Sequence, residues 1–362
     1  MAQKNIGKSV KINRTKCLSI HSTLNYQFAR GQFIQNYQKN YESYSKISLQ
    51  YYGDNTKYFD SDVQLGNGTF GNVYVGKTNK NETIAIKRLN EFYKWEQHYQ
   101  EIFILKHINN VPHIAHLYDV IREQKYPNTT SFIFEFINGT TLHKSARNLT
   151  SDYEVRYLSY ILLKTLNQTH ELNVIHNDLK GCNIQINLEQ LSLKVLDWGI
   201  SYIYHPYQIK SNIGGTVNYK SPEQLLNSNF VSHFTPAIDV FAAGLLIANL
   251  MYRGTDLFYS HFDYEVFSKQ IQFFGYKKMT KLSALLNVNI NSTIYSNFTL
   301  NRTGFYHNSY LKRRQFITTD GINLLQQMLQ INPADRISIS EALQHKYFDS
   351  IRNVQESLFH DN

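Results

Sequence analysis

The chain has 362 residues, of which 42% are hydrophobic and 14% aromatic, with only 17 glycines and 6 prolines. These values exclude a mainly disordered or collagen-like chain and allow one or two packed cores. The net charge of +9 is concentrated at one end, because residues 1–41 hold seven of the 37 Lys and Arg residues and none of the 28 acidic ones. The rest of the chain is nearly neutral, so we expect no nucleic-acid partner.

Residues 1–41 are predicted to form a flexible basic extension. The alternatives for this arm are a nuclear-import or anion-binding tail, an organelle presequence, or a simple solvated extension. Cys17 and Cys182 are too few for a disulfide framework or a zinc site, which favours a reducing compartment, cytoplasmic or nuclear. The longest apolar run, 240–248, is too short to span a bilayer, so no membrane association is expected.

Short runs of β-branched and aromatic residues come first along the chain and predict strands. The predicted strands cover 63–65, 72–75, 83–86 and 131–134. Apolar residues at three- and four-residue steps predict helices, one of them among the strands and the others later. The predicted helices cover 91–107, 152–172, 238–252 and 321–329. The chain therefore changes from mainly strand to mainly helix after its first third.

A turn at Asn138-Gly139 separates the two kinds of structure. We predict an α+β fold of two lobes, a small β-rich lobe over 58–136 and a larger, mainly helical lobe over 140–350, with a cleft at their junction. Together they form one domain over 42–350. Residues 351–362 are assigned to a C-terminal tail.

A glycine-rich segment lies between the first two predicted strands. Glycines let backbone N–H groups come close to phosphate oxygens. A strand rather than a helix follows Gly71, which disfavours a dinucleotide-binding loop. A hairpin with turn glycines has the same pattern, so the segment alone is a weak indication of nucleotide binding. The candidate residues are Leu65, Gly66, Asn67, Gly68, Thr69, Phe70, Gly71, Asn72 and Val73.

Lys87 and Glu101 follow the glycine-rich segment. Lys87 comes 14 residues after Val73, at the predicted end of a strand, where a lysine can bind the α- and β-phosphates of a nucleotide. Glu101, on the next predicted helix, is the candidate carboxylate that holds it. Separately, each is an ordinary surface charge on an amphipathic element. In this order after a glycine-rich loop, the pair favours a phosphate-binding function.

The segment from His176 to Asn183 carries the strongest chemical pattern. Phosphoryl transfer needs a carboxylate for the attacking hydroxyl, a cation near the γ-phosphate, and oxygen ligands for Mg²⁺. Asp178 is the candidate base and Lys180 the candidate cation, while Asn183 and Asp197 are the candidate metal ligands. Two polar turns at strand ends are the plain alternative, which the order of all four motifs disfavours.

These motifs resemble those of the eukaryotic protein kinases over about 42–350. The resemblance implies a bilobal kinase fold, ATP and Mg²⁺ as cofactors, and protein substrates. Ser221-Pro222-Glu223 is similar to the end of the family's activation segment, and Glu223 would pair with Arg336. The hinge between the lobes would be Glu135 to Asn138. Further ATP-binding positions implied by the resemblance are Ala85, Phe134, Glu135, Ile137, Gln185 and Leu196.

Within the family, the chain is most similar to the catalytic (alpha) subunit of casein kinase II. Asp197-Trp198-Gly199 has Trp where nearly all kinases have Phe, and Tyr204-His205-Pro206 follows as in that subunit. Residues 41–53 resemble the N-terminal segment that keeps it active. The resemblance implies serine/threonine specificity, constitutive activity and a possible regulatory subunit.

Several positions depart from that subfamily. Asn177 replaces the arginine that anchors a phosphorylated activation loop, and Gln185 replaces the apolar residue under adenine. Ile213 and Val217 occupy two positions that are cationic in the subfamily, which leaves Lys220. We therefore expect little preference for acidic substrates. Asn177 and Gln185 also motivate a second hypothesis, a pseudokinase or scaffold module that binds nucleotide or partners without efficient catalysis.

Overall fold

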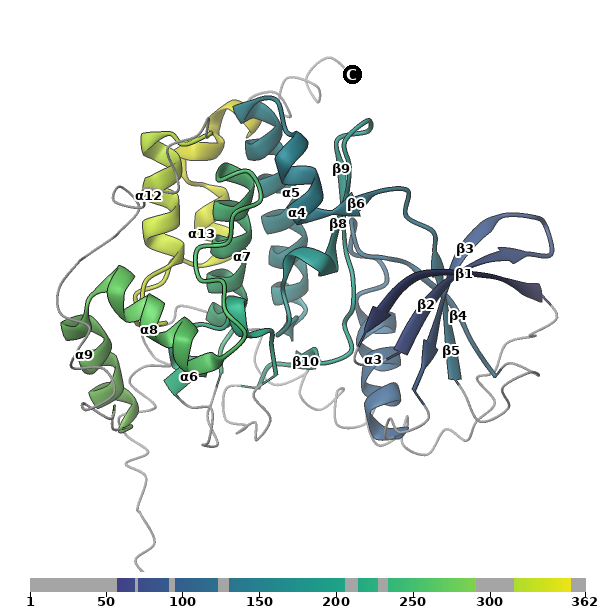
Figure 1. Cartoon of the computed structure of the whole chain (residues 1–362), viewed down its shortest axis with the longest axis horizontal. Coiled ribbons are helices and arrows are strands. Elements are labelled where there is room, and N and C mark those ends of the chain that lie inside the picture. Colours follow the sequence, from purple (N-terminus) through teal and green to yellow (C-terminus); the bar gives the residue numbers. More distant parts are fainter. Residues whose placement is uncertain are drawn as a thin grey trace, which may run out of the picture.

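The computed structural model of the chain consists of two lobes joined side by side (Figure 1). The described residues are 57–68, 71–90, 95–122, 130–205, 214–226, 234–288, 290 and 316–352. The basic arm, the segment 41–53 and most of the predicted C-terminal tail lie outside these ranges, as do Thr69, Phe70 and Ile213. The two-lobed α+β architecture predicted from the sequence is confirmed.

In the described part of the chain, the smaller lobe is one antiparallel sheet with strand order β1-β2-β3-β5-β4, and helix α3 (Trp95–His107) lies beside it (Figure 1). Alternate residues of the strands face inward, since side chains in a strand have a period of two. Ile84, Ile86, Ile121 and Ile133 form its small core. The strands are β1 (Tyr58–Gly68), β2 (Gly71–Thr78), β3 (Thr83–Leu89), β4 (Leu117–Arg122) and β5 (Thr130–Glu135).

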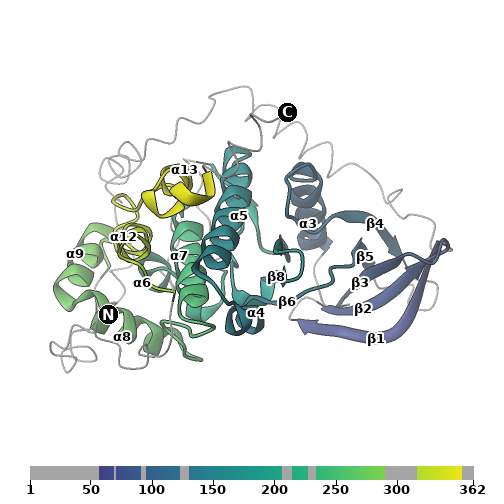
Figure 2. The ribbon, with the colours of Figure 1, turned by 90° about the horizontal axis from the view of Figure 1, so that it is seen from above.

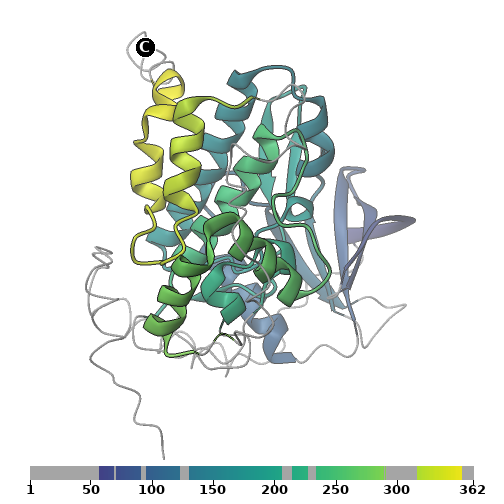
Figure 3. The same ribbon diagram turned by 60° about the vertical axis from the view of Figure 1, so that its left-hand side comes forward.

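The larger lobe is built around α7, whose fifteen residues are all buried. Helices pack around it, and α5 begins with a capping box between Ser151 and Glu154. Figure 3 shows α12 and α13 on the outer side of this lobe. The helices are α4 (Leu142–Asn148), α5 (Asp152–Glu171), α6 (Pro222–Leu226), α7 (Ala237–Met251), α8 (Asp263–Phe274), α9 (Tyr276–Leu286), α12 (Thr319–Met328) and α13 (Ile339–Leu343), with short 3₁₀ turns η2 (Gly181–Asn183), η3 (Val217–Tyr219) and η5 (Lys346–Phe348).

Short strands at the junction of the lobes hold the segments that carry the chemistry (Figure 2). The hairpin of β8 (Ile184–Asn187) and β9 (Ser192–Val195) connects Asn183 to Asp197, and β6 (Thr140–Thr141) pairs with β8. β7 (Val174–Ile175) precedes that hairpin in the chain and β10 (Tyr202–Ile203) follows it, and the two strands pair with each other. The pairing therefore brings both polar segments to the same edge of the helical lobe.

The predicted elements agree with the structure except in details. Strand β4 was not predicted, because Asp119 interrupts its apolar run and a bulge follows Leu117. The prediction that β3 ends at Lys87 is wrong, since its pairing continues to Leu89 opposite Gly71. Of the helix predicted over 91–107, the structure describes the part from Trp95. Among the described residues, no helix is both long enough and apolar enough to cross a membrane.

Candidate active site

The strand register of the small lobe brings the predicted nucleotide-binding residues together. Val73 of β2 lies opposite Lys87 of β3, and Ala85 of β3 lies opposite Phe134 of β5. The described part of the glycine-rich segment lies at the paired ends of β1 and β2, with Gly68 opposite Gly71. Gly71 is required there, since a Cβ would lie 1.9 Å from the carbonyl oxygen of Arg88 and its φ is +155°.

Lys87 makes two ion pairs across the junction of the lobes. Its Nζ lies 2.7 Å from Glu101 Oε1 on α3 and 2.9 Å from Asp197 Oδ1. Burial by itself would lower the pKa of Lys87. The carboxylates of Glu101 and Asp197 outweigh this effect and raise the pKa above its ordinary value. Burial also opposes ionisation of Asp197, but the Lys87 ammonium holds the pKa of Asp197 below its usual range. Both groups are therefore charged at neutral pH.

Asp178 and Lys180 form the centre of the site on the helical lobe. Lys180 Nζ lies 2.7 Å from Asp178 Oδ2, and the side chain of Asn183 donates to the backbone oxygen of Asp178 at 2.9 Å. Burial alone would lower the pKa of Lys180, but the Asp178 carboxylate raises it. Lys180 and Asn183, both predicted from the sequence, thus each contact Asp178.

Asp239, on the buried helix α7, holds the backbone of this segment in place. Its Oδ2 accepts from the backbone N–H of His176 at 2.7 Å, and its Oδ1 accepts from that of Asn177 at 2.9 Å. His170 Nε2 lies 3.0 Å from Oδ2. Asn177 adopts φ +67°, a left-handed conformation that asparagine tolerates better than most residues. The buried carboxylate therefore fixes the turn that presents Asp178.

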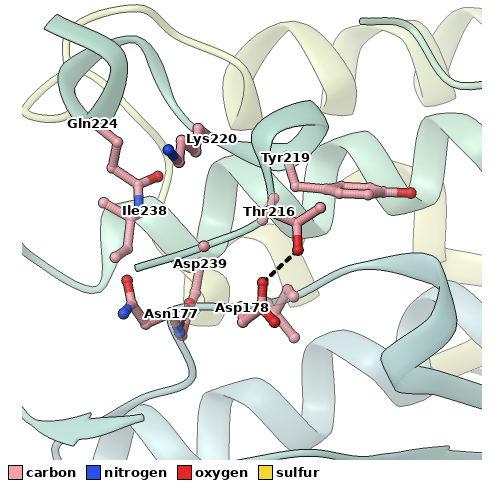
Figure 4. A pocket seen from close by; sticks show the side chains of 11 residues that line it. Asn177, Asp178, Thr216, Tyr219, Lys220, Gln224, Ile238 and Asp239 are labelled. Carbon is pink, nitrogen blue, oxygen red and sulfur yellow. Dashed lines mark hydrogen bonds between the residues drawn. The ribbon is translucent and has the colours of Figure 1, made fainter. Parts of the chain in front are cut away.

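Thr216 is a site residue whose role the sequence did not indicate. Its hydroxyl donates to Asp178 Oδ1 at 2.7 Å, and both residues line a pocket between the Asp178 segment and the segment 214–220 (Figure 4). Thr216 is one of several hydroxyl residues between Asp197 and Glu223, and nothing in the sequence distinguishes it from the others. The two residues are 38 positions apart, so no local pattern could reveal this contact.

Asn183 and Asp197 have the chemistry of a Mg²⁺ site. The backbone oxygen of Asn183 accepts from the N–H of Leu196 at 2.8 Å, which sets Asn183 beside Asp197. One amide and one carboxylate oxygen suit Mg²⁺, which takes few protein ligands and completes its shell with phosphate oxygens and water. No cluster of three His, Cys, Asp or Glu side chains occurs among the described residues, so a purely protein-made metal cage is not present in that part of the chain.

The predicted hinge residue Glu135 joins the lobes through its side chain. Its Oε1 accepts from the backbone N–H of His116 at 2.8 Å and lies 2.5 Å from Lys194 Nζ. Gln185 is the cross-strand neighbour of Lys194, and its Oε1 is buried without a hydrogen-bond partner in the described structure. Lys194 was not among the predicted site residues, because a lone lysine on a hairpin carries no signal by itself.

The activation segment is anchored at both ends by neutral or buried contacts. Asn177 Nδ2 donates to the backbone oxygen of Ile200 at 3.2 Å. At the other end, the predicted pair between Glu223 and Arg336 is present, with Nη1–Oε1 and Nη2–Oε2 distances of 2.8 and 3.0 Å. Lys220, a cation in the described part of the segment, is bound to Asp263 at 2.8 Å.

The chain matches the protein kinase domain over residues 59–348. This is most of its length, so the chain belongs to the protein kinase family. The fold and the arrangement of Lys87, Glu101, Asp178 and Asp197 agree with that membership. Family membership implies ATP as the phosphate donor and protein as the acceptor.

Proposed function

We propose that this protein is an active serine/threonine kinase of the casein kinase II alpha type that uses Mg-ATP, with Asp178 as the base. The observation that carries the proposal is the contact of Thr216 with Asp178 beside Lys180. The threonine and the lysine each hold one carboxylate oxygen, which fixes the orientation of the carboxylate. Figure 4 shows the bond to the threonine. A base must lie within hydrogen-bond reach of the proton that it accepts.

The other residues take roles that follow from their charge. Lys87, fixed by Glu101, would bind the α- and β-phosphates, and Lys180 would lie near the γ-phosphate. Asn183 and Asp197 would bind Mg²⁺, which neutralises charge on the phosphate oxygens. The adenine pocket would be formed by the glycine-rich hairpin and by the hinge side of the cleft. Its predicted residues on that side are Ala85, Phe134, Glu135, Ile137, Gln185 and Leu196.

Constitutive activity is part of the proposal. The ion pair of Lys87 with Glu101, which an active kinase requires, is formed at 2.7 Å. Tyr219 and Ser221, two hydroxyls of the activation segment, are buried and so are poor phosphorylation sites. Gln100 Nε2 on α3 donates to the backbone oxygen of Ser201 at 2.5 Å, which ties the helix to the activation segment without a charge. A regulatory subunit and a cytoplasmic or nuclear location remain predictions.

A pseudokinase is the second candidate, and one observation favours it. The buried and unpartnered Oε1 of Gln185 lies on the strand that should support adenine, where an unsatisfied polar group opposes binding of an apolar ring face. Against this, every predicted metal- and phosphate-binding side chain is present. The phosphate-binding side would therefore still bind nucleotide in either case.

The test compares two conservative variants with the wild-type chain. Asp178→Asn should lower turnover with Mg-ATP and a generic protein substrate more than about a hundredfold, because positioning and charge supply most of the acceleration. It should leave ATP binding nearly intact, whereas Asp197→Asn should also weaken Mg-ATP binding. Radiolabel transfer gives turnover, and the Mg²⁺-dependent thermal shift gives binding. Wild-type turnover in Asp178→Asn would reject the assignment, and nucleotide binding without turnover in the wild type would identify a pseudokinase.

A further inference from the structure

The net charge of the chain after the basic arm is small, but it is unevenly distributed along the sequence. Residues 266–319 hold eight Lys and Arg residues and no Asp or Glu. Residues 42–265 and 320–362 together hold 22 basic and 28 acidic residues. An acidic body therefore carries one strongly basic stretch, and such a concentration of one sign of charge attracts ligands of the other sign.

Helix α9 lies in this stretch and presents three lysines on its outer side. Lys277, Lys278 and Lys281 are exposed, whereas Met279 and Leu282 are buried against the lobe. The helix packs against α6 and α8 at the end of the larger lobe that lies farthest from the small lobe (Figures 1 and 2). None of the three lysines forms an ion pair within the described part of the chain. Their charges are therefore available to a partner.

The positions of these lysines work against the stability of the helix. Lys277 and Lys278 lie in the first turn of α9, which has no acidic residue, although the helix dipole favours negative charge there. Lys277 and Lys281 are four residues apart, a spacing at which like charges on a helix repel each other. Folding alone would favour an acidic residue in this first turn. The three lysines suit the binding of an anionic partner instead.

The size and composition of this face favour an acidic protein segment over a nucleic acid. Proteins that bind nucleic acids commonly neutralise about six to ten phosphates, more than three lysines on one helix can do. Carboxylates at alternate positions of an extended peptide are about 6.6 Å apart, close to the spacing of Lys277 and Lys281. Leu285 follows at the next four-residue step and is 51% exposed. An apolar side chain among the carboxylates of a peptide would pack against it.

We propose that the basic face of α9, formed by Lys277, Lys278, Lys281 and Leu285, binds an acidic protein segment that carries an apolar side chain. Complementary charge brings the segment to this face and excludes basic partners. None of the residues that line the pocket beside Asp178 belongs to α9. The proposal therefore goes beyond the proposed kinase function and gives the chain a second binding function, the recruitment of an acidic protein.

The experiment measures binding of a labelled peptide to the full chain by fluorescence polarisation. The peptide alternates Glu and Gly around one central Leu, and it contains no hydroxyl, so it cannot be phosphorylated. The reference peptide has Gln in place of every Glu. We expect the Glu peptide to bind about tenfold or more tightly than the Gln peptide at low salt. The difference should fall as added salt screens the charges.

Lys277→Glu is the main variant, because binding and stability should change in opposite directions. It should reduce binding of the Glu peptide about tenfold. It should also raise the unfolding temperature slightly, since a glutamate at 277 suits the helix dipole and can pair with Lys281. Lys164→Glu makes the same change of charge at an exposed position of α5 and is the control. It should leave binding unchanged.

Leu285→Gln tests the apolar part of the face. This variant should weaken binding of the Glu peptide about threefold, because it removes an apolar contact. It should leave binding of a second Glu peptide, in which Gly replaces the central Leu, unchanged. Equal losses with both peptides would show that Leu285 does not contact the apolar side chain and would overturn that part of the proposal.

Other partners of this face have their own outcomes. Equal binding of the Glu and Gln peptides, or binding that persists in Lys277→Glu, overturns the proposal. Labelled single-stranded RNA and vesicles that contain phosphatidylserine are measured in the same way. If either binds at least as tightly as the Glu peptide and is lost in Lys277→Glu, the face binds a nucleic acid or a membrane, and the proposal is rejected. None of these measurements needs catalysis, so their outcome is independent of the kinase test.

Discussion

Gly181 shows how closely the site is packed at the scale of one residue. It lies between Lys180 and Asn183, and a Cβ there would lie 2.0 Å from His143 Nδ1. The imidazole is held from its other side, with Nε2 3.0 Å from Asp256 Oδ1 and 3.1 Å from the Tyr219 hydroxyl. The ring cannot move away without losing these bonds. A methyl group at 181 would therefore displace either the ring or the backbone that presents Asp178.

Gly181→Ala should consequently lower activity, whereas Gly181→Ala/His143→Ala should recover most of it. Overpacking of this kind costs about 1–3 kcal/mol, and removal of the ring relieves it. The backbone at 181 is not in the left-handed region, so alanine itself is tolerated there. The rates of the two single variants and the double variant form a double-mutant cycle. Additive losses in that cycle would show that the ring does not limit position 181.

At the scale of elements, the pair of Glu223 on α6 and Arg336 fastens the activation segment to the helical lobe. The side chains are 5% and 0% exposed, and Arg336 also donates to the backbone oxygen of Ala237 at 2.6 Å. Glu223→Gln should destabilise the protein by about 3–5 kcal/mol, because it leaves the guanidinium buried without its counter-charge. Urea unfolding followed by circular dichroism measures this loss.

A matched surface pair provides the control for that variant. Lys346 and Asp320 are 3.8 Å apart and 73% and 39% exposed. Lys346→Ala should change stability by about 1 kcal/mol at most, since exposed pairs contribute little. Equal effects of the two variants would mean that the Glu223 pair is not structurally important.

The contacts of the segment 214–220 lead to an expectation about acidic substrates. Lys220 is neutralised by Asp263, and Val217 is partly buried against the core. We expect peptides with an acidic run after the hydroxyl to be phosphorylated no more than about tenfold better than neutral ones, because an acidic run gains little from neutral surroundings. Peptide kinetics at low and moderate salt measure the ratio.

Asp263→Asn tests the cause of that weak preference. The variant frees Lys220 to meet an acidic substrate and should raise the acidic-to-neutral ratio, while Lys220→Met should not. A strong, salt-sensitive acidic preference in the wild type would show that other basic residues line the groove.

At the scale of the whole molecule, the proposed constitutive activity predicts a role for the chain before Lys57. The unphosphorylated protein should be active, and phosphatase treatment should not reduce its rate. A chain beginning at Lys57 should be weaker by about tenfold, which corresponds to roughly 1.4 kcal/mol in the activation free energy. A chain beginning at Tyr41, which lacks only the basic arm, is the control and should keep its activity. Full activity of the shorter chain would contradict the predicted role of 41–53.

Much of this molecule could be predicted from sequence, because the relevant signals are local. The strands and helices follow from patterns with periods of two and about 3.6 residues, so α5 and α7 agree within one residue at each end. The order of the glycine-rich segment, Lys87, Asp178 and Asp197 is a linear property, and it suffices to indicate phosphoryl transfer. The pairing of Lys87 with Glu101 was also predicted from the sequence, since both residues lie on adjacent elements of one lobe.

Only the tertiary structure decided the contacts between distant segments. The bond of Thr216 to Asp178, the packing of His143 on Gly181 and the neutralisation of Lys220 by Asp263 each join residues that are 38 or more positions apart. Such contacts depend on how whole elements pack, and no local periodicity encodes them. The sequence by itself therefore determined the family and indicated the chemistry, whereas the tertiary structure decided which groups restrain the Asp178 carboxylate and that Lys220 is paired with Asp263.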